Sequence, residues 1–231
     1  MAKIHDKDVR GRTQTGWLDS HHTFSFGGFN DPSRMGHRAL RVLNEDRVIP
    51  GAGFGEHDHE AVDILTYVLS GALKHADSIG NGSTIGPGEI QHMWAGTGVS
   101  HSEMNASGSE AVHFLQIWLL PDKAGGKPTY TQKPIDDSTI RNRLGLLAGP
   151  HGKAPIALQS DNYLFLARLE DGQHIEHRFE GKRAGFIHVV DGMITIEGER
   201  LSAGDGLEFA GEEVCSIDAA SDCEVLLFDL A

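Results

Sequence analysis

The chain has 231 residues, of which 39% are hydrophobic and 23% charged, a composition typical of a globular protein. Its formal net charge of −13 argues against direct binding to nucleic acid or to an anionic membrane surface, because both need a basic face. No apolar run approaches transmembrane length and no signal-peptide core is present, so we expect a cytoplasmic protein without a membrane segment. Cys215 and Cys223 are the only cysteines, which predicts no disulfide framework.

Frequent glycines favour a turn-rich β architecture over helices along the whole chain. In chain order, the predicted strands cover residues 40–43, 47–49, 63–69 and 111–120, separated by glycine turns at 51–55, 80–82 and 86–88. Residues 111–120 are apolar on both faces, as expected of a central strand, and Pro121 ends that run. Residues 121–137 are polar and rich in Gly, Pro and Lys, which predicts a linker, and residues 140–147 predict a short helix or turn.

Two short pairs of metal-capable side chains are the most informative feature of the sequence. They are His57-Asp58-His59 and His101-Ser102-Glu103. Side chains at i and i+2 of a strand point to the same face, so each pair delivers two ligands to one side of a sheet. If the two strands are neighbours, three imidazoles and one carboxylate converge on one ion, a set that suits transition metals better than calcium or magnesium. The glycine spacing around the pairs resembles the two cupin motifs.

The second half of the chain repeats the first in outline. Residues 186–192 echo 65–71, and residues 201–209 echo 85–93, each as strand, glycine turn and strand. We therefore expect an all-β bicupin of two tandem antiparallel, jelly-roll-like β-barrels. The predicted domains are an N-terminal metal-binding domain, 1–135, and a C-terminal domain, 136–231. The C-terminal domain lacks the ligand pairs, since His174 and His177 are spaced i, i+3 and fall on opposite faces of a strand.

Further residues are candidates for supporting such a site. His75, His92 and His113 could hydrogen-bond the ligand imidazoles, although each is also an ordinary strand or core histidine. A planar ligand could lie in an apolar pocket lined by Phe26, Phe54, Trp94, Gln116 and Trp118, for most of which plain barrel core is the competing interpretation. We expect His5, His37 and His151 to be exposed loop histidines.

Several longer motifs lie between residues 16 and 120. They are Gly16-Trp17-Leu18, His22-Thr23-Phe24-Ser25-Phe26-Gly27, Leu40-Arg41-Val42-Leu43-Asn44, Gly53-Phe54-Gly55-x-His57-x-His59, Gln91-x-Met93-x-Ala95-Gly96-Thr97-Gly98-x-x-His101-Ser102-Glu103 and Leu115-Gln116-Ile117-Trp118. With these motifs the chain resembles the pirin family, and in particular the bacterial pirin-like proteins described as quercetin 2,3-dioxygenases.

The resemblance implies one divalent transition metal ion held by His57, His59, His101 and Glu103. Fe(II) is the expected ion, with Zn, Cu, Ni, Mn or Co as alternatives. It also implies cleavage of flavonols such as quercetin by O2, with loss of carbon monoxide and with Glu103 as the catalytic group that takes the 3-hydroxyl proton. Asp58 stands where the family commonly has Pro, and Asp63 stands where it commonly has Glu, which leaves local charge and substrate preference open.

Two other interpretations remain. Nuclear pirins act as metal-dependent transcriptional cofactors, so the chain could be a metal-bearing regulatory protein that acts through a protein partner. It could also be a metal-dependent enzyme of another class, such as an isomerase or hydrolase. An enzyme needs an open metal position and an apolar cavity with an entrance, whereas a regulator needs only a metal and an exposed surface.

Overall fold

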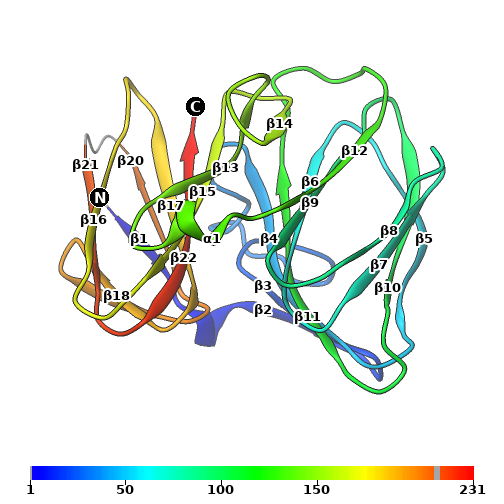
Figure 1. The fold of residues 1–231 in the computed structure, drawn as a ribbon, viewed down its shortest axis with the longest axis horizontal. Helices are drawn as coiled ribbons and strands as arrows, with labels where there is room; N and C mark the ends of the chain where they lie inside the picture. Colours follow the sequence, from blue (N-terminus) through cyan, green and yellow to red (C-terminus); the bar gives the residue numbers. More distant parts are fainter. Residues whose placement is uncertain (1, 211–213) are drawn as a thin grey trace. The chain divides into compact units, whose positions relative to one another are not determined.

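The computed structural model describes residues 2–210 and 214–231, and in this part of the chain strands dominate. The chain forms two compact units (Figure 1). The N-terminal unit comprises Gly11–Ile135 and Leu158–Ser160, and the C-terminal unit comprises Met1–Arg10, Asp136–Ala157 and Asp161–Ala231. Each unit is built from one seven-stranded and one four-stranded antiparallel sheet, which confirms the all-β bicupin prediction.

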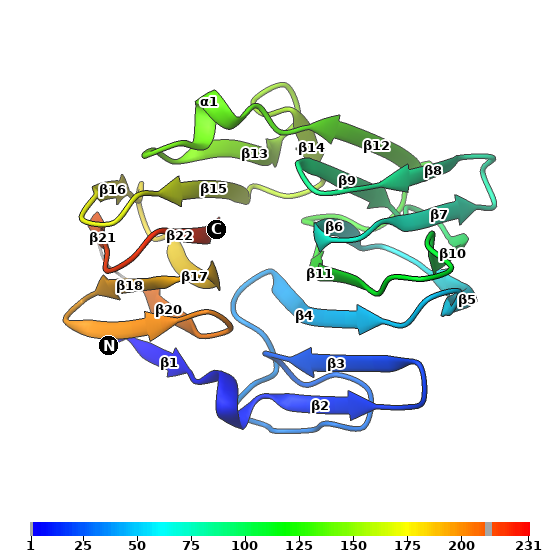
Figure 2. The same ribbon diagram turned by 60° about the horizontal axis from the view of Figure 1, so that its bottom comes forward.

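The seven-stranded sheet of the N-terminal unit has the order β12-β9-β6-β11-β4-β3-β2, and its four-stranded sheet has the order β5-β10-β7-β8. The strands are β2 (Gly11–Gln14), β3 (Leu18–His22), β4 (Leu40–Val48), β5 (Gly53–His59), β6 (Asp63–Ser70), β7 (Leu73–Asp77), β8 (Gly82–Ile85), β9 (Glu89–Trp94), β10 (Val99–Asn105), β11 (Val112–Leu119) and β12 (Thr129–Pro134). Figure 2 shows β2 and β3 beside β4 at one edge of the larger sheet.

The core of the N-terminal unit lies between its two sheets. One buried cluster combines Val68 and Phe114 of the larger sheet with Leu73 and Ile85 of the smaller sheet. Each such side chain stabilises the fold by about 1.5–3 kcal/mol through removal of apolar surface from water. Burial of these side chains fixes which face of each sheet points inward. Because residues alternate between the two faces of a strand, it also fixes which residues of β5 and β10 point inward.

The C-terminal unit repeats this design. Its sheets have the orders β1-β20-β17-β22-β15-β13-β14 and β16-β21-β18-β19. The strands are β1 (Lys3–His5), β13 (Gly145–Pro150), β14 (Ile156–Leu158), β15 (Tyr163–Leu169), β16 (His174–Arg178), β17 (Ala184–Asp191), β18 (Met193–Ile196), β19 (Glu199–Ser202), β20 (Gly206–Ala210), β21 (Val214–Ala219) and β22 (Cys223–Leu230). Val189, Ile194, Ile217 and Leu227 are among the residues of its core. No helix within the described residues is long and apolar enough to cross a membrane.

One local prediction is wrong. Residues 121–137 are not only a linker, because β12 pairs with β9 along its whole length. The polar, half-exposed sequence of β12 gives no strand signal, and Pro134 is tolerated because β12 lies at a sheet edge. Of the short helix or turn predicted within residues 140–147, the structure has a turn at Asn142, followed by β13. The short helix α1 (Asp137–Ile140) lies just before it, and Asp136 caps this helix by accepting a hydrogen bond from the Ser138 amide.

His5 is not an exposed loop histidine. It is buried on β1, which pairs with β20 of the C-terminal unit. Its Nε2 lies 3.3 Å from Glu208 Oε2, and its ring packs edge-on against Phe186 with centroids 5.5 Å apart. His151 is exposed as expected, and His37 is half-buried.

Candidate metal centre

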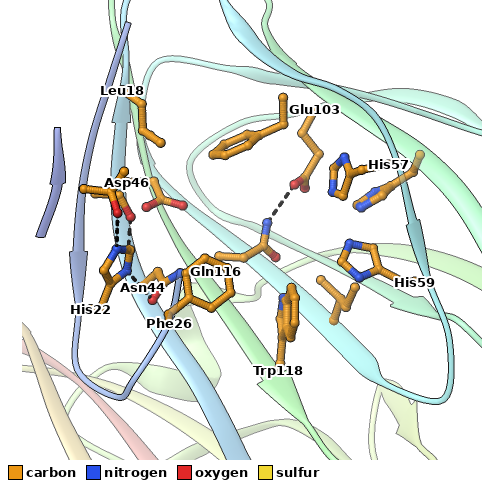
Figure 3. Close-up of a pocket in the computed structure, with 15 residues that line it drawn as sticks. Leu18, His22, Phe26, Asn44, Asp46, His57, His59, Glu103, Gln116 and Trp118 are labelled. Atoms are coloured by element: carbon orange, nitrogen blue, oxygen red, sulfur yellow. Dashed lines mark hydrogen bonds between the residues drawn. The ribbon is translucent and has the colours of Figure 1, made fainter. Parts of the chain in front are cut away.

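The two ligand pairs come together because β5 and β10 are neighbouring antiparallel strands. In their register His101 lies opposite His57, and the register shifts between His101 and Glu103. The ring centroids are 4.4 Å apart for His57 and His101, and 4.8 Å apart both for His57 and His59 and for His59 and His101. The nitrogens of these three histidines lie close enough together to hold one metal ion. Figure 3 shows His57, His59 and Glu103 at one end of a cavity.

A second group of metal-capable side chains overlaps the first. It consists of His75, His101 and Glu103, all buried, with one ligand atom from each within 4.8 Å of the others. His75 enters because β7 pairs with β10 on the other side, which sets His75 opposite Glu103. Both metal-capable groups found among the described residues are thus in the N-terminal unit and share His101.

Hydrogen bonds distinguish the roles of these imidazoles. Gln91 Nε2 donates to His75 Nδ1 at 3.2 Å, so His75 Nε2 carries the proton and donates to Asp77 Oδ2 at 3.2 Å. His101 Nδ1 lies 3.4 Å from the same His75 Nδ1, so the single lone pair of that atom is shared between the N–H groups of Gln91 and His101. His57 Nδ1 donates in the same way to the Gly55 carbonyl oxygen at 2.7 Å.

With the proton of His101 on Nδ1, its Nε2 carries no proton and has a free lone pair. This atom is buried and has no hydrogen-bond partner, an arrangement that costs free energy unless something occupies the position. Metal-ligating histidines commonly donate the N–H of their second nitrogen to a neighbouring acceptor, and Nδ1 of His57 and Nδ1 of His101 each face such an acceptor. The residues present therefore fit a transition metal.

The electrostatics also keep His59 and His101 in the form that can bind a metal. Burial first, and then the neighbouring His57, lower the pKa of His59 to about 4, although Asp58 acts in the opposite direction. Burial lowers the pKa of His101 to about 2, with further lowering by the imidazoles around it. Both rings are thus neutral at neutral pH, and neutral imidazole is the form that binds metal.

Glu103 is held differently from the histidines. Burial raises the pKa of its carboxyl group, while hydrogen bonds and nearby imidazoles act against that rise. Gln116 Nε2 donates to Glu103 Oε2 at 2.8 Å, a bond drawn in Figure 3, and Thr66 Oγ1 lies 3.3 Å from Glu103 Oε1. The carboxyl group is therefore oriented by two neutral donors rather than by a cation.

A row of polar side chains across the larger sheet supplies these partners. The cross-strand register aligns His22 with Asn44, Asn44 with Gln116, Gln116 with Thr66, and Thr66 with Gln91. All five are buried in strands that are otherwise largely apolar. Of this row, sequence analysis named only Gln116, as a residue lining the pocket. The polar residues at inward positions of apolar strands were the signal for the others.

The site opens into a cavity of about 270 Å³ beside the histidines. Phe26, Phe54, Gln116 and Trp118 line it as expected, whereas Trp94 does not and is a core residue with 2% exposure. The other lining residues are Thr13, Leu18, Ser20, His22, Asn44, Asp46, His57, His59, Ile64, His101 and Glu103. The exposed surface of the cavity is thus mainly apolar, with polar side chains at defined points, as in small-molecule sites.

The remaining candidates lie outside the cluster. His92 Nε2 contacts Asp63 Oδ1 at 2.7 Å, and His113 Nε2 contacts Glu45 Oε1 at 2.9 Å, so of the three supporting histidines only His75 reaches a ligand pair. Asp63 also accepts from the Gln159 amide at 2.9 Å, which gives this departure from the family pattern a structural role. Asp58, the other departure, is exposed and accepts a hydrogen bond from the Ser100 hydroxyl.

In the C-terminal unit the two histidines on β16 are bound to carboxylates. His174 Nδ1 lies 2.8 Å from Asp218 Oδ1, and His177 Nε2 lies 2.7 Å from Asp229 Oδ2. Neither histidine belongs to a group of three mutually close metal-capable side chains among the described residues.

Comparison with known proteins agrees with this geometry. Residues 4–119 match the Pirin family, and residues 146–230 match the Quercetinase C-terminal cupin domain family. The chain is 42% identical over 231 residues to a quercetin 2,3-dioxygenase of Escherichia coli K12, covering 100% of this chain and 99% of that protein. It is 34% identical to a pirin-like protein of Caulobacter vibrioides, with 97% of each chain covered.

A solved structure is equally similar. The crystal structure of the bacterial pirin YhhW from Escherichia coli in complex with nickel(II) superposes with a TM-score of 0.95, at 41% identity, covering 100% of this chain and 99% of that one. Sequence and structure thus agree over the full length, and the chain belongs to the pirin family.

Proposed function

We propose that this protein is a metal-dependent dioxygenase that cleaves flavonols such as quercetin with O2. The observation that carries the proposal is the unpartnered, buried His101 Nε2, which sits among three histidines beside an aromatic cavity. The full-length similarity to a quercetin 2,3-dioxygenase supports the same reaction class.

The ligand set in this proposal is His57, His59, His101 and Glu103. His75 is the competing fourth imidazole, but both of its nitrogens already serve Gln91, Asp77 and His101. Recruiting His75 as a ligand would break hydrogen bonds between buried groups, which is costly. His75 therefore acts as the partner that fixes the orientation and proton position of His101.

Fe(II) is the proposed ion. Imidazole and carboxylate also accept nickel, copper, zinc, manganese and cobalt, and the similar protein YhhW has been crystallised with nickel(II). When bound, the ion supplies Lewis-acid polarisation of a substrate oxygen and orients the substrate.

Residues of the chain supply the rest of the chemistry. The Glu103 carboxylate accepts the proton of the flavonol 3-hydroxyl, and burial makes it a stronger base than an exposed glutamate because it raises the pKa. Gln116 and Thr66 hold the carboxylate in place. General-base help of this kind contributes about 10²–10⁴-fold to the rate. Phe26, Phe54 and Trp118 exclude water and hold a planar ring system.

The cavity favours this function over a regulatory one. A metal-bearing protein that acts only through a protein partner needs no aromatic cavity beside its metal, and an isomerase or hydrolase needs no cavity with aromatic walls in particular. In the same proposal, the C-terminal unit has a structural role, since its β16 histidines are occupied by carboxylates.

The test is oxygen uptake with quercetin by protein reconstituted anaerobically with Fe(II), and in parallel with Ni(II). We expect uptake that depends on the metal, and a loss of about 10²–10⁴-fold in Glu103→Gln. Glu103→Ala shows whether any carboxylate is needed, and metal content is measured for every variant. Full turnover by a metal-loaded Glu103→Gln protein would remove the base role, and no uptake by any metal form would move the assignment to a regulatory protein.

A further inference from the structure

We propose that Asp46 determines substrate specificity by hydrogen-bonding a phenolic hydroxyl on an outer ring of the substrate, at the end of the cavity away from His57 and His59. This inference rests on the proposed function, because it concerns the same cavity and the same class of ligand.

The position of Asp46 carries the argument. It lies on β4 with Ser20 opposite it on β3 and Phe114 opposite it on β11, and its side chain lines the cavity. In Figure 3 Asp46 and Leu18 lie at one end of the cavity, and His57, His59 and Glu103 lie at the other. A ligand held at Glu103 that fills the cavity therefore ends beside Asp46.

Asp46 is also the cavity carboxyl group with unused bonding capacity. Asp46 is only 3% exposed, and its Oδ1 atom is buried with no hydrogen-bond partner. The neighbouring polar groups are paired with each other. Asn44 Oδ1 contacts His22 Nδ1 at 2.9 Å, and His22 Nε2 contacts Thr13 Oγ1 at 2.9 Å. A buried acceptor without a partner is costly, and a ligand donor at this point would remove the cost.

The chemistry of the surroundings indicates a hydroxyl group. Leu18 and Phe54 make this part of the wall apolar, so a charged amine would be poorly solvated there. Burial raises the pKa of Asp46 to about 7, with Glu103 and Glu45 adding to the rise against the Ser20 hydrogen bond. The group can therefore accept or donate near neutral pH, and a phenol is the common ligand group that can do both.

The test is anaerobic calorimetric binding of two flavonols to the metal-loaded protein. Quercetin carries hydroxyls on both outer rings, whereas 3-hydroxyflavone carries none and keeps only the 3-hydroxyl. We expect the wild type to bind quercetin roughly 10- to 100-fold more tightly than 3-hydroxyflavone. Asp46→Val keeps strand propensity but removes the polar group, so it should weaken quercetin binding and abolish the preference while leaving 3-hydroxyflavone binding in place.

Two further variants make the result specific. Asp46→Asn keeps a hydrogen-bonding side chain of the same size and should retain most of the preference for quercetin over 3-hydroxyflavone. This variant can still be measured if Asp46→Val does not fold. Glu45→Gln makes a similar charge change on the adjacent residue, whose side chain contacts His113 and does not line the cavity, and should leave the preference intact.

The outcomes separate this inference from the proposed function. Equal affinity of the wild type for both flavonols, or an unchanged preference in Asp46→Val, overturns the role of Asp46 and leaves a flavonol dioxygenase standing. Failure of either flavonol to bind the wild type at all overturns both, because the cavity then takes another class of ligand.

Discussion

At the scale of single residues, the proposed ligand arrangement depends on where each imidazole keeps its proton. His75 receives a hydrogen bond from Gln91 and gives one to Asp77, so it can only accept from His101. That acceptor role fixes the free lone pair of His101 on Nε2, the atom without a partner. The contact with His75 thus orients the imidazole of His101, which we propose as a metal ligand.

Replacing His75 tests this chain of hydrogen bonds. His75→Leu removes the acceptor for His101 Nδ1–H, and we expect nickel(II) affinity to fall about 10–100-fold, the usual effect of losing a partner of a ligating histidine. Competition with a chelator measures the affinity, and thermal unfolding checks that the variant folds. His113→Gln is the control, since His113 bonds Glu45 away from the cavity. Equal loss in both variants would show a general effect on the fold.

At the scale of strands, the sequence predicted the convergence of His57, His59 and His101 but not the polar side chains around them. His57-x-His59 and His101-x-Glu103 each lie within three residues, so strand alternation alone aligns them. Asn44, Gln116 and Gln91 meet only through the register of separate strands, which no local pattern reveals. The edge strand β12 was missed for a related reason, because its polar sequence is stabilised by pairing with β9 rather than by burial.

The close approach of β5 and β10 can be tested at Gly53. A Cβ atom there would lie 2.3 Å from the Glu103 carbonyl oxygen and 2.5 Å from Met104 Cα, so the strands would have to separate. We expect Gly53→Ala to cost about 1–3 kcal/mol of stability, as overpacking does, and to weaken metal binding because the two ligand pairs lose their alignment.

Gly55→Ala provides the matched control on the same strand, since a Cβ at Gly55 meets nothing within 4 Å. Thermal unfolding and nickel(II) titration of both variants check the prediction. Wild-type metal affinity in Gly53→Ala would show that the spacing of β5 and β10 does not control the site.

At the scale of the whole chain, the repeat of strand, glycine turn and strand correctly predicted two tandem barrels. It did not reveal that the N-terminal residues join the C-terminal unit, where β1 extends the sheet through β20. Asp205 contributes to this attachment. It accepts from the Lys7 amide through Oδ1 at 2.9 Å and from the Ser202 amide and hydroxyl through Oδ2 at 2.8 and 2.9 Å.

The pH dependence of stability follows from these bonds. Burial alone would raise the pKa of Asp205, but the hydrogen bonds from Lys7 and Ser202 outweigh it and hold the pKa below its ordinary value. A carboxyl group whose pKa is lowered in the folded state stabilises the fold fully above the ordinary Asp range, near pH 4. It loses that contribution as the pH falls through the folded-state pKa.

Asp205→Asn should therefore lower Tm by roughly 2–4 °C at pH 7, and by progressively less as the pH falls below about 4. Asp8→Asn, on an exposed residue of the nearby 3₁₀ turn η1 (Lys7–Val9), makes the same charge change and should leave Tm almost unaltered at both pH values. A Tm difference for Asp205→Asn that stays constant between pH 7 and pH 3 would mean that shape, rather than the ionised carboxylate, attaches the N-terminal segment.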